Sequence, residues 1–139
     1  VQNCIRLAID NAGVRAADID AINGHLTATT KDPVEILNWS TALELEGADF
    51  PFVNAFKGHM GHCLAAGGSL ESVGTVLQFR DNQVYGNINC EDLHPDIVAI
   101  IDPEKVPQKS IAYSPKIIAK ASFGFGDVNA CIIFSHYNN

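Results

Sequence analysis

The chain has 139 residues, of which 47% are hydrophobic and 18% charged, and this balance is typical of a soluble globular domain with one core. Its net charge of −7 argues against nucleic acid as a partner, because surfaces that bind nucleic acid are basic. No apolar run approaches the roughly 20 residues that span a bilayer, so we expect no membrane association. The four cysteines form no CxxC pair, so we expect reduced thiols, no bound metal and a cytoplasmic protein.

The first part of the chain is predicted to be helical, with one short strand. Residues 1–11 have helical periodicity, and Gly13 is a suitable residue to end that helix. Residues 21–23 form a short apolar strand. A second helix is expected from Asp32, as its cap, to about Leu45. Because the chain opens inside a helical pattern without an initiator Met, we expect it to be a piece of a larger protein.

The middle of the chain is predicted to contain a strand, a glycine-rich loop and a helix. The strand covers residues 52–54, and the helix runs to about Arg80. One apolar face of this helix is expected to face the core. The residues on that face are Leu70, Val73, Val76, Leu77 and Phe79.

The C-terminal part is predicted to end in a hairpin. Residues 96–109 contain two prolines and are interpreted as a surface excursion. Strands at 117–122 and 129–135 flank a glycine turn at 123–127, which is typical of a β-hairpin. The tail, 137–139, is expected to be frayed. This order of elements predicts an α/β fold with a mixed sheet covered by helices.

Polar residues gather where the predicted strands end. Residues 22–35 lead from a strand through His25 and threonines into a helix. Residues 54–71 repeat this design with several chemically active side chains, namely Lys57, His59, His62 and Glu71. Strand ends are where α/β folds place chemistry, because the sheet fixes the loop and helix N-termini offer free N–H groups. Together with the glycine turn at 123–127, these junctions predict one convergent site.

These three stretches, in this order, resemble the β-ketoacyl-acyl carrier protein synthases of fatty acid synthesis, which have the thiolase fold. The motifs are His-x-Thr-x-Thr before an acidic helix start, Lys-x4-His with Glu nine residues later, and Phe-Gly-Phe-Gly before a last strand. The resemblance covers nearly the whole chain and corresponds to the family's C-terminal half. It therefore implies a single domain over residues 1–139, of layered α/β/α type, with the N-terminal half absent.

The resemblance also implies a reaction and a set of catalytic residues. Family members decarboxylate malonyl-acyl carrier protein and join the resulting enolate to an acyl group held on a cysteine. His25 and His62 match the two catalytic histidines, and Lys57 matches the active-site lysine. Glu71 matches a glutamate that supports the site from behind.

Further residues match positions that bind the substrate. Thr27 and Thr29 match threonines that hold the pantetheine arm. The backbone N–H of Phe125 matches an oxyanion donor, and its ring matches a gate. The resemblance implies acyl carrier protein as partner and a homodimeric full-length protein. No cofactor is expected, since the phosphopantetheine arm arrives on the carrier protein.

The sequence departs from the family pattern at three points. Leu26 follows the first histidine where the family usually has Gly, and the loop from His25 to Asp32 is one residue shorter. Where the family usually has Gly-Gly-Thr, this chain has Gly126-Asp127-Val128. Leu26 and Asp127 are therefore expected to affect substrate specificity. The nucleophilic cysteine belongs to the family's N-terminal half. We therefore expect this chain alone to be inactive.

Other interpretations remain open. His59 and His62 are too few ligands for a zinc site, which usually has three or four. Neither GxGxxG nor GxxxxGK[ST] is present, which weakens a nucleotide-binding interpretation. A non-catalytic partner subunit of a condensing-enzyme pair, which lacks the nucleophile, is the main alternative. A thiolase-like acyltransferase that does not decarboxylate malonyl is a third.

Overall fold

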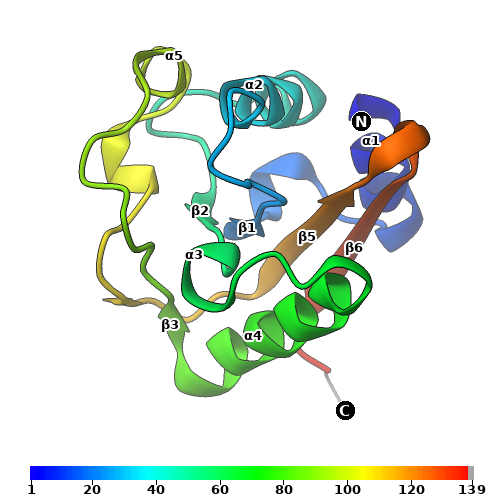
Figure 1. The fold of residues 1–139 in the computed structure, drawn as a ribbon. Helices are drawn as coiled ribbons and strands as arrows, with labels where there is room; N and C mark the ends of the chain where they lie inside the picture. The colour runs from blue at the N-terminus through cyan, green and yellow to red at the C-terminus, as the bar shows by residue number, and fades with distance from the viewer. Residues whose placement is uncertain (138–139) are drawn as a thin grey trace.

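A four-stranded mixed sheet organises the computed structural model, which describes residues 1–137 (Figure 1). Its strand order is β2-β1-β5-β6, and β1 pairs in parallel with both β2 and β5. The strands are β1 (Ala21–Asn23), β2 (Phe52–Asn54), β5 (Ile117–Phe123) and β6 (Asn129–Ser135). Strands β5 and β6 form the antiparallel hairpin that the sequence predicts. Of the predicted tail, Asn138 and Asn139 lie outside the described residues.

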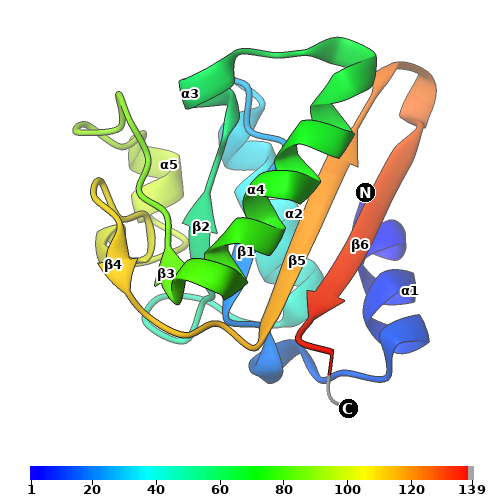
Figure 2. The ribbon, with the colours of Figure 1, turned by 90° about the horizontal axis from the view of Figure 1, so that it is seen from below.

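Helices cover both faces of this sheet, as Figure 2 shows. Helices α1 (Gln2–Ala12) and α2 (Asp32–Leu43) lie on one face, and α4 (Gly67–Asp81) lies on the other. The short helices α3 (Lys57–Met60) and α5 (Pro95–Val98) lie in the connections. This arrangement confirms the predicted α/β class with a mixed sheet covered by helices. In the part of the chain that the structure describes, no helix is long and apolar enough to cross a membrane.

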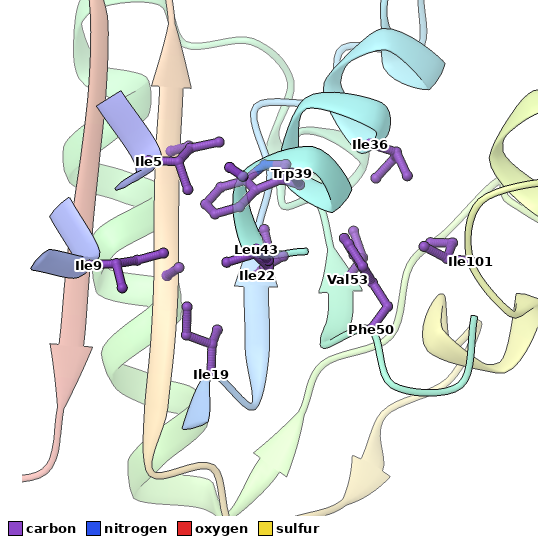
Figure 3. Close-up of a cluster of buried hydrophobic side chains, with 13 residues drawn as sticks. Ile5, Ile9, Ile19, Ile22, Ile36, Trp39, Leu43, Phe50, Val53 and Ile101 are labelled. Atoms are coloured by element: carbon purple, nitrogen blue, oxygen red, sulfur yellow. The ribbon is translucent and has the colours of Figure 1, made fainter. Parts of the chain in front are cut away.

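The main apolar core lies between the sheet and helices α1 and α2 (Figure 3). Trp39 of α2 is fully buried there, packed with isoleucines from α1 and with Ile22 of β1. Each such buried side chain contributes about 1.5–3 kcal/mol to folding. Ile101 is also buried in this core, so residues 96–109 are not the pure surface excursion that the prolines indicated.

The opposite face of the sheet is partly polar, because side chains alternate along each strand. Val53 and Ala119 join the main core, whereas their neighbours Asn54 and Lys120 bond to residues of α4. The Asn54 amide reaches Gln78, and Lys120 reaches Glu71. Helix α4 is therefore attached to the sheet through buried polar contacts as well as through apolar ones.

This polar layer corrects the predicted orientation of α4. The residues expected in the core, Leu70, Val73 and Val76, are exposed, while Glu71 and Gln78 are buried. Of the predicted apolar face, Phe79 alone is buried as expected, and Leu77 is partly so. The helix turns its polar side inward because the sheet offers amide and ammonium partners there.

Two further local predictions were incomplete. Helix α2 ends at Leu43, where Glu44 takes a left-handed conformation, two residues before the predicted end. A second, two-stranded sheet joins β3 (Gln83–Val84) to β4 (Ile111–Ala112). Strands of two residues are too short to show an alternating pattern, so no periodicity predicted them.

Candidate active site

The predicted site residues line one open cleft of about 1180 Å³ at the carboxyl ends of the parallel strands. His25 follows β1, Lys57 begins α3 just after β2, and Glu71 comes from the second turn of α4. The cleft is lined by all seven residues to which the family resemblance assigned a role, namely His25, Thr27, Thr29, Lys57, His62, Glu71 and Phe125. His59 does not line it.

His25 is held in place by its backbone. The N–H groups of His25 and Leu26 donate to the two carboxylate oxygens of Glu35 on α2, at 2.7 and 2.9 Å. A Cβ on Gly24 would lie 2.8 Å from the Leu26 side chain, so a larger residue here would force that side chain to shift. Burial raises the pKa of Glu35 to about 7, although the two N–H bonds oppose that rise.

The imidazole rings of His25 and His62 lie edge to face, with centroids 5.4 Å apart and planes at 83°. His62 Nδ1 accepts the backbone N–H of Leu64 at 3.1 Å. Neutral His62 therefore carries its proton on Nε2, free to donate. Burial, followed by the positive charge of Lys57, lowers the pKa of His25 and keeps its ring neutral at neutral pH. The two imidazole rings thus share one cleft, and His62 has its Nε2 directed away from the backbone bond.

Behind the histidines lies a buried cluster of three charged side chains. Lys57 Nζ is paired with Glu71 Oε1, and Lys120 Nζ lies 2.7 Å from Glu71 Oε2. The Lys120 contact is an ion pair, because its angles fall outside hydrogen-bond geometry. Lys120 also donates to the Ala121 carbonyl at 3.1 Å and to Ser122 Oγ. Sequence reasoning missed Lys120, although a lysine in the middle of a predicted buried strand was a usable signal.

The threonine loop is fixed by Asp32, which the sequence assigned to capping α2. Instead, Lys31 is the N-cap residue, with no side-chain cap, and the Asp32 carboxylate accepts the N–H groups of Thr27 and Ala28 at 3.0 Å each. Ala28 adopts a left-handed φ of 57°, which turns the chain between the threonines. The Thr27 and Thr29 hydroxyl groups lie 3.2 Å apart at the edge of the cleft.

Phe125 stands at the mouth of the cleft with 99% of its surface exposed. It begins the 3₁₀ turn Phe125–Asp127, in which Gly126 and Asp127 have left-handed φ values of 73° and 59°. Phe123 lies deeper, with its ring edge to face against His25 at 6.2 Å. The turn therefore places one phenylalanine beside His25 and the other in the open.

A smaller pocket of about 250 Å³ adjoins the cleft and shares Lys57 and His62 with it. Cys90 lines this pocket, and burial raises the pKa of its thiol, which makes it a poor nucleophile. Of the described residues, no cysteine lines the main cleft. Within residues 1–137, no group of three or more His, Cys, Asp or Glu is arranged to hold a metal ion.

The family model "Beta-ketoacyl synthase, C-terminal domain" matches residues 1–91. This chain belongs to that family. Among its curated relatives, 3-oxoacyl-[acyl-carrier-protein] synthase 2 of Rhizobium meliloti is 34% identical over 96% of this chain and 31% of the relative. The chloroplastic 3-oxoacyl-[acyl-carrier-protein] synthase II of Arabidopsis thaliana is also 34% identical, over 96% of this chain and 24% of the relative. This β-ketoacyl synthase chain thus spans about a third or less of the length of these relatives.

Solved structures confirm the thiolase-like ketosynthase fold. The ishigamide ketosynthase/chain length factor superposes with a TM-score of 0.86 and 28% identity, over 96% of this chain and 32% of that one. A β-ketoacyl synthase from Burkholderia phymatum also gives a TM-score of 0.86. At 23% identity over 99% of this chain and 32% of that one, the second likeness concerns the fold alone.

Proposed function

We propose that these residues belong to a 3-oxoacyl-[acyl-carrier-protein] synthase that extends acyl chains in fatty acid biosynthesis by decarboxylative Claisen condensation. The observation that carries the proposal is the pair of imidazole rings, with centroids 5.4 Å apart, beside the buried Lys57–Glu71 pair. The names of the curated relatives support the same activity. The chain supplies His25, His62 and Lys57, and the cysteine nucleophile comes from outside it.

In the proposed reaction, malonyl-acyl carrier protein loses its carboxylate as carbon dioxide. The electron pair of the broken carbon–carbon bond moves to the thioester, whose oxygen becomes an enolate. N–H groups of His25 and His62 donate to that oxygen where the negative charge develops. The enolate carbon then attacks the acyl thioester held on the cysteine. A new carbon–carbon bond forms and the cysteine leaves as thiolate.

Substrate binding is proposed for the exposed rim of the cleft. Thr27 and Thr29 present hydroxyl groups there that suit the amides of a pantetheine arm. Phe125, which is exposed at the mouth of the cleft, is proposed to gate the acyl chain, and its backbone N–H is proposed as an oxyanion donor. Acyl carrier protein is the proposed partner, in keeping with the relatives' names. The remaining proposals are a cytoplasmic full-length homodimer and no cofactor other than the arm on the carrier.

A non-catalytic partner subunit, of the chain-length-factor kind, is the second candidate. The likeness to the ishigamide ketosynthase/chain length factor favours it to the same extent as it favours a ketosynthase. The two candidates differ in the nucleophile motif, because a partner subunit lacks that cysteine. The presence of His25, His62 and Lys57 together favours the enzyme, since a partner subunit has no chemical need for all three.

The test is decarboxylation of malonyl-acyl carrier protein by the complete protein that carries these residues. We expect His25→Ala and His62→Ala each to lower the rate about 10²–10³-fold, the usual loss for one oxyanion donor. His94→Ala, on an exposed histidine outside the cleft, is the control and should retain the rate. A wild-type protein that is inert with correctly loaded carrier protein would refute the enzyme and favour the partner subunit.

The 139 residues on their own are predicted not to condense acyl and malonyl thioesters. The physical reason is that the cleft has no cysteine among its lining residues to hold the acyl group. Mass spectrometry after incubation with an acyl donor should find no acylated cysteine in the cleft and no 3-oxoacyl product. Detection of that product would show that the chain contains its own nucleophile.

A further inference from the structure

The buried part of the site holds two lysines that contact only one carboxylate among the described residues. The described charged residues with less than a tenth of their surface exposed are Glu35, Lys57, Glu71 and Lys120. The Glu35 carboxylate accepts hydrogen bonds from the backbone N–H groups of His25 and Leu26, so its partners are not the lysines. Two lysines therefore share the single carboxylate of Glu71, one on each of its oxygens.

The contacts of Lys120 match those of a charged ammonium group. Its Nζ donates hydrogen bonds to the Ala121 carbonyl and Ser122 Oγ, and it forms an ion pair with Glu71 Oε2. With 2% of its surface exposed, Lys120 is not among the described residues that line the cleft, so it is not placed to touch a substrate there. Lys57 differs, because Glu71 is its sole hydrogen-bond partner among the described residues, and it lines both the cleft and the adjoining pocket.

We propose that Lys120 is a positioning residue of this site. It holds Glu71 from the side of β5, which leaves the free N–H groups of Lys57 directed to the cleft, and it gives the cluster one positive charge in excess. That excess favours an anion in the cleft. If the proposed function holds, the anion is the malonyl carboxylate and then the enolate.

The same excess charge acts on His25. The charged and titratable groups around His25 come from four elements and one loop. They are Glu35 of α2, Lys57 of α3, His62 of the loop after α3, Glu71 of α4 and Lys120 of β5. The positive charge of Lys120 works with burial to lower the pKa of His25, whereas Glu71 works against it. Lys120 thus helps to keep His25 neutral and able to donate.

The test replaces Lys120 with Met in the complete protein and follows two readouts. The first is titration of the His25 ring Cε1–H by NMR, assigned with His25→Gln. The second is the pH profile of malonyl-acyl carrier protein decarboxylation. We expect both the His25 titration and the acid limb of the profile to move up by about half to one pH unit, because the variant removes one positive charge that opposes protonation of His25.

Two variants control this experiment. Lys116→Met removes the same charge from an exposed residue just before β5 and should move neither readout. Lys120→Arg keeps the charge and should return both readouts towards wild type. If Lys120→Met does not fold, Lys120→Gln keeps a donor for Glu71 and Ser122 while removing the charge, and it is measured in the same way.

The outcomes separate this inference from the proposed function. A lowered melting temperature with an unmoved His25 titration would overturn the inference and leave Lys120 a purely structural residue. A protein without decarboxylation activity would refute the proposed function, and the NMR titration would still decide the role of Lys120. Movement of both readouts in Lys120→Met but not in Lys116→Met would establish it.

Discussion

At the residue scale, Glu71 is the single counter-ion for two buried ammonium groups. Glu71→Gln is therefore expected to lower the free energy of unfolding by about 3–5 kcal/mol, the usual cost of breaking a buried ion pair. Denaturant titration measures this change. The control is Glu104→Gln on an exposed glutamate, which should cost less than about 0.5 kcal/mol. Equal effects of the two substitutions would contradict the buried cluster.

The raised pKa of Glu35 is expected to make the free energy of unfolding depend on pH. Its folded pKa, about 7, lies above its usual value of 4.5, so folding binds a proton between those two pH values. Its contribution to stability is complete below about pH 4.5 and lost as pH rises through about 7, to a total of about 3 kcal/mol. Denaturant titrations from pH 4 to 8 measure this slope. Glu35→Gln should flatten it, whereas Glu104→Gln should leave it intact.

The sequence predicted which motif residues gather in one cleft, because strand ends in a parallel arrangement meet at one edge of the sheet. It did not predict the neighbouring residues that hold these motif residues in position. Glu35 and Asp32 act through backbone N–H groups of a loop whose conformation no residue pattern reveals. Lys120 was not predicted as part of the site, since lysine is rarely buried. The catalytic roles of His25 and His62 stay a prediction.

At the element scale, α4 shows why periodicity alone misplaced a helix. Three of its apolar residues, Leu70, Val73 and Val76, lie outward, while polar Glu71 and Gln78 lie inward against Lys120 and Asn54 of the sheet. Periodicity locates a stripe on a helix but carries no information about what that stripe faces. The strands and helices with one apolar face, such as α2 with Trp39, were located correctly because their partner is an ordinary core.

The packing of α4 also predicts the effect of a single methyl group. A Cβ on Gly74 would lie 2.6 Å from the ring of Phe56, which is itself buried. Gly74→Ala should therefore lower the free energy of unfolding by about 1–3 kcal/mol through overpacking, despite the better helix propensity of Ala. Ser69→Ala, at an exposed position of the same helix, is the control for propensity alone. A stabilising Gly74→Ala would contradict this packing.

At the scale of the whole molecule, the outer face of α4 is apolar and exposed at Leu70, Val73 and Val76. The chain spans 31% of the Rhizobium relative, so a longer protein has ample chain to cover this face. Val73 is 58% exposed, and in the 139-residue chain Val73→Lys should change the free energy of unfolding by less than about 0.5 kcal/mol. In a protein where the face is covered, the same change should cost about 2 kcal/mol or more.

Denaturant titration of both forms decides this prediction, with Leu37→Lys as control. Leu37 is 52% exposed on α2, across the sheet from α4. A similar small effect of Val73→Lys in both forms would show that the outer face of α4 stays open to solvent.

The open cleft has a further chemical consequence. His62 and Phe125 stand exposed on a side that this chain does not close, so bulk water has free access to the place where an enolate would form. Water protonates the enolate carbon and converts it to an acetyl thioester before any carbon–carbon bond forms. If the proposed condensation holds, whatever covers the cleft must exclude solvent as well as bring a nucleophile, because a reactive carbanion survives only where water is excluded. The yield of condensation per malonyl consumed is the quantity that this exclusion of solvent controls.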